Sequence, residues 1–198
     1  MPSAPAPSGL SAPASSCGTK VPARMWIVMG DLHGETARLQ DVPGLAEADG
    51  VIVTGDLTVA GGVAQARPVM DALVRRNPVV YAQIGNMDRG EITGWLDERD
   101  WNTHLRVREL APGVALMGLG GSTATPFGTP SEFSEAQYAA WLKHMGKEAA
   151  TWRHVVLSAH TPPLGTLCDV ISGGTHVGSS AVRDFILEAQ PDVCLCGH

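Results

Sequence analysis

Short apolar runs recur along the chain, and each is followed closely by glycine or a polar residue. Val, Ile, Leu and Met dominate these runs, whose lengths suit buried strands better than helices. The predicted strands cover residues 25–29, 51–54, 79–84, 114–119, 155–158 and 193–196.

Segments with helical spacing separate most of these strands. They cover residues 35–45, a segment that ends near Arg76, and residues 91–99, 134–149 and 179–189. Pro43 interrupts the first of them. The second begins at Val63 or at Pro68, and proline fits a first helical turn better than a helix interior. Ser134 is a residue type that caps helices.

The alternation of strands and helices indicates an α/β fold. A strand-rich stretch in the middle of the chain breaks the simple strand–helix–strand rhythm. That break predicts a second sheet packed on the first, with helices outside. We expect one domain over residues 25–198, preceded by a disordered tail over residues 1–24 that is rich in Pro, Ala and Ser.

Potential metal ligands follow five of the predicted strands. In chain order they are Asp31 and His33, Asp56, Asn86 and Asp88, His160, and His198. One such residue after a strand is ordinary, because polar residues often end strands. That tendency does not explain the whole series. In open α/β sheets, ligands bind just beyond the carboxyl ends of the strands. We therefore expect these side chains to meet at one edge of the fold.

The candidate ligand atoms are oxygens and nitrogens, with no thiolate among them. Such a set suits Mn, Fe, Co, Ni or Zn. Asp56 follows Gly55, which allows the backbone to approach a bound ion, and its two carboxylate oxygens can bridge two ions. Two ions about 3.5–4 Å apart would activate a shared water and hold a phosphoryl group for in-line displacement.

Composition narrows the class of partner and the compartment. The net charge of −6 argues against a groove that follows a nucleic-acid backbone. The sequence has no run of 18 apolar residues and no apolar signal-peptide core, so neither a membrane span nor secretion is expected. The four cysteines form no disulfide-like framework, which favours a cytoplasmic protein.

The chain resembles the calcineurin-like metallophosphoesterases in a set of ordered motifs. They are Gly30-Asp31-Leu32-His33, Gly55-Asp56, Gly85-Asn86-Met87-Asp88, Ala159-His160 and Gly197-His198. The stretch 120–130, followed by Glu132 and Ser134, is similar to an Icc-related branch of predicted phosphoesterases. The resemblance covers residues 25–198. It implies a four-layer α/β/β/α sandwich with a dimetal site at one edge.

The resemblance also implies a set of metal ligands for two divalent ions, with Mn favoured. These ligands are Asp31, His33, Asp56, Asn86, His160 and His198. Asp56 would bridge the ions, the two residues before it would bind the first, and the three after it would complete the second.

Two further residues are candidates for catalysis. Asp88 matches the acid that stands behind the ligands in the resembling family. His176 lies in a Gly-rich loop, where it would contact the substrate phosphate or supply a proton. The alternative for His176 is an ordinary loop histidine.

The chain departs from the family pattern at two places. Many members have His where this chain has Met87, and a thioether cannot donate a proton. The family pattern also has a second histidine two residues after the position of His198, which binds the first ion, and further strands beyond it. Because the sequence ends at His198, we expect a weaker first metal site and an uncovered sheet edge.

Together these features imply a metal-dependent phosphoesterase. The reaction would be hydrolysis of a small phosphodiester or phosphomonoester by a hydroxide shared between two ions, and Met87 favours diesters or good leaving groups. The alternative is a non-catalytic scaffold or binding module with the same fold. A scaffold need not keep Asp31, Asp56, Asn86 and His160 together, and this chain keeps them all.

Overall fold

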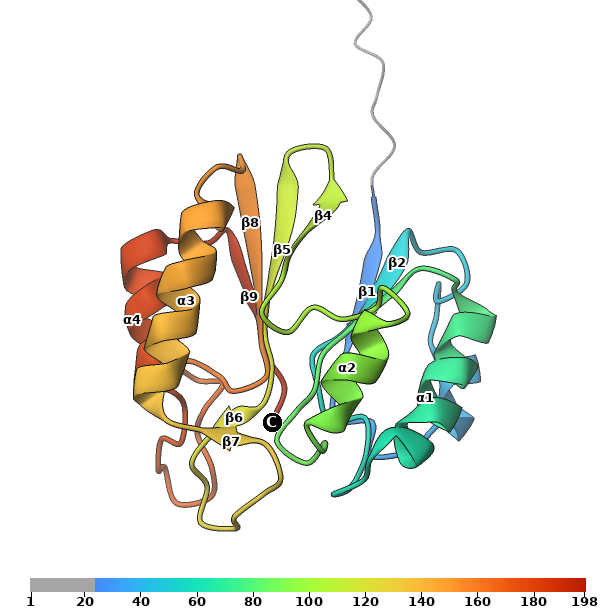
Figure 1. Ribbon diagram of the computed structural model, residues 1–198, viewed down its shortest axis with the longest axis horizontal. Coiled ribbons are helices and arrows are strands. Elements are labelled where there is room, and N and C mark those ends of the chain that lie inside the picture. Colours follow the sequence, from blue (N-terminus) through green and yellow to red (C-terminus); the bar gives the residue numbers. More distant parts are fainter. Residues whose placement is uncertain (1–23) are drawn as a thin grey trace, which may run out of the picture.

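The computed structural model describes residues 24–198, which form two sheets packed face to face between two layers of helices (Figure 1). The sandwich has the α/β/β/α order expected from the sequence. The tail predicted over residues 1–24 lies outside the described residues except for Arg24. Within residues 24–198, no helix is both long enough and apolar enough to cross a membrane.

The first sheet is parallel and has the order β1-β2-β3. Its strands are β1 (Trp26–Met29), β2 (Gly50–Val53) and β3 (Val80–Ala82). The helices α1 (Val63–Arg76) and α2 (Glu91–Asp97) cover its outer face, and the short 3₁₀ helix η1 (Ala37–Asp41) lies beside α1.

The second sheet has the order β4-β5-β8-β9. Its strands are β4 (Val107–Ala111), β5 (Val114–Leu119), β8 (His154–Ala159) and β9 (Val193–Leu195). Strands β5, β8 and β9 run parallel, and β4 pairs antiparallel with β5. Helices α3 (Glu135–Ala149) and α4 (Ser180–Ala189) cover this sheet, and a small pair, β6 (Ser122–Thr123) and β7 (Glu132–Phe133), lies near its end.

The alternation of side chains along the strands divides the apolar core into three parts. Val51 and Val53 of β2 face α1 and α2, whereas Ile52 between them faces the second sheet. In β5, Met117 packs towards α3, and Leu116 meets Ile52 between the sheets. The two sheets are therefore held together by a thin apolar layer of their own.

The start of α1 differs from the favoured prediction. The helix begins at Val63, and Pro68 lies in its interior, so the expectation that Pro68 opens the helix is wrong. Two side chains satisfy the free N–H groups of the first turn: Gln65 Oε1 accepts from Gly62 N–H, and Glu91 Oε1 accepts from Val63 N–H. Those partners stabilise the turn before the proline.

The predicted helix over residues 35–45 is also shorter in the structure, where only η1 forms. The cap predicted at Ser134 is confirmed. Ser134 Oγ accepts from Gln137 N–H at the start of α3. Ser179 Oγ accepts from Val182 N–H at the start of α4, where the carboxylate of Glu135 also accepts from Ser180 and Ala181 N–H. Glu135 thereby connects the two helices.

Candidate metal centre

The six predicted ligands meet at one end of the sandwich, close to the C-terminus marked in Figure 1. Asp31, His33, Asp56 and Asn86 follow strands of the first sheet, whereas His160 and His198 follow β8 and β9 of the second. The site is therefore assembled across the interface between the sheets.

Asp31, His33 and Asp56 form the first group. His33 Nε2 lies 3.9 Å from Asp31 Oδ1 and 3.7 Å from Asp56 Oδ2. The other ring nitrogen, Nδ1, lies 3.1 Å from Thr58 O. Because a carbonyl oxygen only accepts, Nδ1 carries the proton, and the lone pair of Nε2 faces the carboxylates. This is the tautomer that binds a metal ion.

The second group contains Asp56 again, with Asn86, His160 and His198. His160 Nε2 lies 3.5 Å from Asp56 Oδ2 and 3.0 Å from Asn86 Oδ1, and His198 Nδ1 lies 2.8 Å from the same amide oxygen. His160 Nδ1 donates to Thr54 O at 3.2 Å, which again leaves Nε2 free to bind. His160 is completely buried, so its orientation is fixed.

The distances fit divalent ions. Within each of the two His and Asp groups, the potential ligand atoms lie within 4.8 Å of one another. Ligands about 2.0–2.2 Å from one ion lie up to roughly 4.3 Å apart, so small movements would close either group around an ion. Asp56 belongs to both groups, as a carboxylate shared between two ions would.

The electrostatics favour the protonation states that bind metal. Burial acts to raise the pKa of Asp56, but His160, when its imidazole is protonated, and the N–H of Met87 outweigh burial and lower it. Burial lowers the pKa of His198, and a protonated His160 would lower it further. Both shifts favour an ionised carboxylate and a neutral imidazole, the ligand forms.

Unusual backbone geometry accompanies the ligands. Asp31, His33 and Asp56 have φ angles of 54°, 47° and 54°, in the left-handed region that most residues avoid. Gly85 approaches the carboxylate and N–H of Asp56 so closely that a Cβ there would collide with both. Such strain persists only where the surroundings enforce it, and it clusters at functional sites.

Asp88 lies beneath the ligands and is completely buried. Oδ2 accepts from Leu57 N–H and Gly85 N–H, and Oδ1 accepts from the N–H and hydroxyl of Thr58. Burial raises the pKa of Asp88, although these hydrogen bonds oppose the rise. The carboxylate thus joins the loop that carries Asp56 to the loop that carries Asn86.

The structure does not bring His176 into the cluster. Its Nδ1 lies 2.8 Å from Asp169 Oδ1, and among the described residues His176 does not line the cavity at the ligands. Asp169 also accepts from Gly165 N–H and Gly178 N–H, so the pair stabilises the loop that precedes α4.

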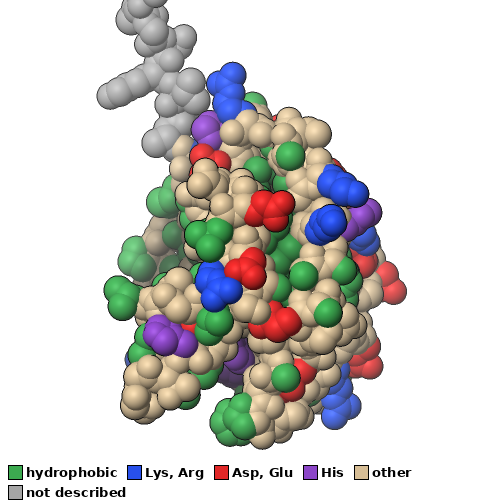
Figure 2. Space-filling model, turned by 90° about the vertical axis from the view of Figure 1, so that its left-hand side faces the viewer, with side chains coloured by type: hydrophobic (Ala, Val, Ile, Leu, Met, Phe, Trp, Pro, Cys, Tyr) green, Lys and Arg blue, Asp and Glu red, His purple; other side chains and the backbone are tan. Residues whose placement is uncertain are grey.

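A cavity of about 1050 Å³ opens directly over the ligands. Asp31, His33 and Asp56 lie on its floor, together with Asn86 and His198. Figure 2 shows a notch at this end of the molecule, with histidine (purple) inside it and hydrophobic side chains (green) on its rim. The walls come from residues 123–130 and from residues near Val59 and Ile171.

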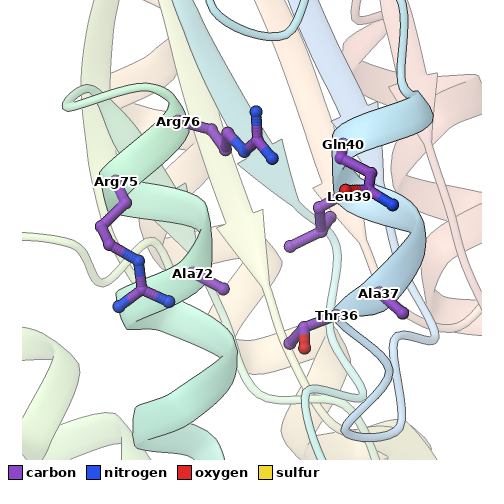
Figure 3. Close-up of a pocket in the computed structure, with 7 residues that line it drawn as sticks. All are labelled: Thr36, Ala37, Leu39, Gln40, Ala72, Arg75 and Arg76. Atoms are coloured by element: carbon purple, nitrogen blue, oxygen red, sulfur yellow. The ribbon is translucent and has the colours of Figure 1, made fainter.

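A second cavity, of about 390 Å³, lies between η1 and α1. Figure 3 shows Arg75 and Arg76 of α1 on one side of it, with Thr36 and Gln40 on the other. None of the candidate ligands lines this cavity. The chemistry predicted from the sequence therefore belongs to the larger cavity alone.

Sequence reasoning missed the residues that orient Asn86. Thr129 Oγ1 accepts from Asn86 Nδ2 at 3.0 Å, which fixes the amide with Oδ1 towards the histidines. Glu132 Oε1 in turn accepts from Thr129 Oγ1 and Thr129 N–H. The only sequence signal was the similarity of the stretch 120–130 and Glu132 to one branch of phosphoesterases, which assigns no role to either residue.

The chain is similar to known proteins in sequence and in fold. The family model described as calcineurin-like phosphoesterase matches residues 26–198. The uncharacterised protein MJ1162 of Methanocaldococcus jannaschii is 29% identical over 178 residues, which are 85% of this chain and 76% of that protein.

Two solved structures share the fold at low identity. TT1561 of Thermus thermophilus has a TM-score of 0.67 and 19% identity, covering 87% of this chain and 80% of that one. Phosphopantetheinyl hydrolase (PptH) from Mycobacterium tuberculosis has a TM-score of 0.54 and 16% identity, covering 88% and 82%.

Proposed function

Because the chain belongs to the calcineurin-like phosphoesterase family, a family of metal-dependent phosphoesterases, we propose that it hydrolyses small phosphate esters with two divalent metal ions. One observation carries this proposal: Asp56 belongs to both ligand groups. Asp31 and His33 would hold one ion with it, and Asn86, His160 and His198 would hold the other.

The ions, when bound, supply Lewis acidity that activates water and offsets the charge of the phosphoryl oxygens. The protein holds the ligands in place before substrate arrives. The carbonyl oxygens of Thr58 and Thr54 orient His33 and His160, and Thr129 orients Asn86. Ligands oriented in advance cost little reorganisation during the reaction.

Asp88 acts in this proposal as a positioning residue rather than as an acid that contacts substrate. It is buried beneath the loops, with its carboxylate oxygens bound to backbone N–H groups of Leu57 and Gly85. His176, which pairs with Asp169 away from the cavity lining, takes no part in the reaction proposed here.

Metal dependence tests the function directly. The purified full chain would be stripped with a chelator, reloaded with Mn or Zn, and assayed on bis(p-nitrophenyl) phosphate and on p-nitrophenyl phosphate. We expect on the order of two ions per chain and turnover only after reloading, with the diester favoured. Metal binding without turnover of either ester would instead support the non-catalytic scaffold.

A second prediction concerns Met87 and the hydrolysis of esters with poor leaving groups. Its side chain lines the cavity, whereas its N–H donates to Asp56 Oδ1 at 2.8 Å, a contact that survives substitution. Met87→His is expected to raise kcat/KM for phenyl phosphate by about 10²-fold, because imidazolium can protonate a poor leaving group. The same variant should change p-nitrophenyl phosphate hydrolysis much less.

Met87→Gln is the matched control, since glutamine is polar but does not act as an acid near neutral pH. An equal gain from Gln, or no gain from His on the poorer leaving group, would contradict the role assigned to Met87.

A further inference from the structure

Large apolar side chains line the cavity above the ligands and are exposed to solvent. Phe127 is 84% exposed, Val59 63%, Ile171 52% and Val177 39%, and all four line the same cavity. An exposed apolar patch that is continuous with a polar cluster marks a binding site more often than chance surface. The patch adjoins the position where a phosphate would bind.

Basic side chains are missing from this cavity. Within residues 24–198, no Lys or Arg lines it. Arg89 lies next in sequence to Asp88, but its Nε donates to Ala60 O at 3.1 Å and its side chain does not line the cavity. Chains of several phosphates are usually held by basic side chains together with metal ions. The lining therefore suits an ester with a single phosphate.

The wall that carries Phe127 is fixed before substrate binds. Glu132 Oε1 accepts from Thr125 Oγ1 at 2.6 Å and from Thr129 Oγ1 at 2.6 Å. Burial acts to raise the pKa of Glu132, but these hydrogen bonds outweigh it and lower the pKa to about 2. Thr129 also accepts from Asn86 Nδ2, so the loop is tied to a candidate metal ligand.

We propose that this cavity selects phosphate esters whose organic group is apolar, an aryl or long alkyl group, which packs on Phe127, Ile171 and Val177. The inference rests on the proposed phosphoesterase function and names its substrate class. The phosphate would bind at the ligands, and the apolar group would extend along the wall in the 1050 Å³ cavity. A nucleoside would leave its polar ribose against these side chains, at a cost in desolvation.

Three diesters with the same leaving group and the same charge test this specificity. Each is a p-nitrophenyl ester, and the other substituent is methyl, phenyl or thymidine 5′. We expect kcat/KM for the phenyl diester to exceed that of the methyl diester by about 10-fold or more, because the ring buries apolar surface on the wall. The thymidine diester should gain no such advantage.

Substitutions in the wall test which side chains cause the preference for the phenyl diester. Phe127→Ala should reduce the phenyl-to-methyl ratio to about 3 or less, and Phe127→Leu should retain most of it. Leu167→Ala is the matched control, because Leu167 is 97% exposed and does not line the cavity, and it should leave the ratio unchanged.

The outcomes separate this inference from the function on which it rests. Equal kcat/KM for the three diesters, or a preference for the thymidine diester, would overturn the apolar specificity and leave the phosphoesterase activity standing. A phenyl preference that survives Phe127→Ala would remove Phe127 from the binding wall. Absence of hydrolysis of all three by the metal-loaded chain would overturn both proposals.

Discussion

Replacing Asp56 with Asn is expected to reduce kcat/KM on the order of 10³-fold and to lower the number of bound metal ions. Asp56 Oδ2 faces both His33 and His160, at 3.7 and 3.5 Å, and Oδ1 accepts from Met87 N–H. Asparagine can keep the contact with Met87, but it removes the charge and the second oxygen. The change therefore affects the shared ligand with little effect on the loop.

The measurement combines metal analysis with steady-state kinetics on bis(p-nitrophenyl) phosphate. Asp192→Asn is the matched control, because Asp192 also contacts a histidine, His154 Nδ1 at 3.0 Å, and a backbone N–H, yet lies outside the cavity lining. Full metal content and activity in the Asp56 variant would exclude a bridging role.

Replacing Asp88 with Asn is expected to lower the free energy of unfolding by about 2–4 kcal/mol. Its two oxygens accept from Leu57, Gly85 and Thr58, and the residue is fully buried. An amide NH₂ in place of one oxygen turns a donor towards these N–H groups and leaves them unsatisfied. Activity should fall as well, because Leu57 and Gly85 adjoin Asp56 and Asn86.

Urea denaturation of the chelated protein measures this loss without a contribution from bound metal. Asp97→Asn serves as the control, because Asp97 Oδ1 also accepts two hydrogen bonds, from Asn102 and Arg106, while its side chain is 35% exposed. A difference of less than about 1 kcal/mol between the two variants would show that water or relaxation replaces the lost acceptor.

The sequence predicted that the candidate ligands lie together because the rule that places them is local. A short apolar run followed by Asp, Asn or His puts that side chain at the end of a strand, and parallel strands bring such ends together. His160 and His198 could be grouped with Asp56 on this ground, and the structure brings them within 4.8 Å of it. The break in the middle of the chain predicted the second sheet with helices outside, and the resemblance to the phosphoesterase family implied the four-layer order.

Other features depend on contacts between distant residues, which periodicity does not encode. The start of α1 at Val63 depends on Glu91, 28 residues away. His104 matched no motif, yet it is buried, burial lowers its pKa to about 4, and Nδ1 accepts from Gly120 N–H. The role of Glu132 depends on Thr129, which lies beside Asn86 although 43 residues separate them in the sequence.

The division of the ligands between the two sheets has a consequence for stability. Asp31, His33 and Asp56 all follow strands of the first sheet, whereas the second ligand group combines Asp56 and Asn86 of that sheet with His160 and His198 of the other. An ion bound by the second group would link the two sheets across the thin apolar layer around Ile52 and Leu116. Each tenfold rise in free metal above the dissociation constant of that site would then add about 1.4 kcal/mol to the free energy of separating the sheets.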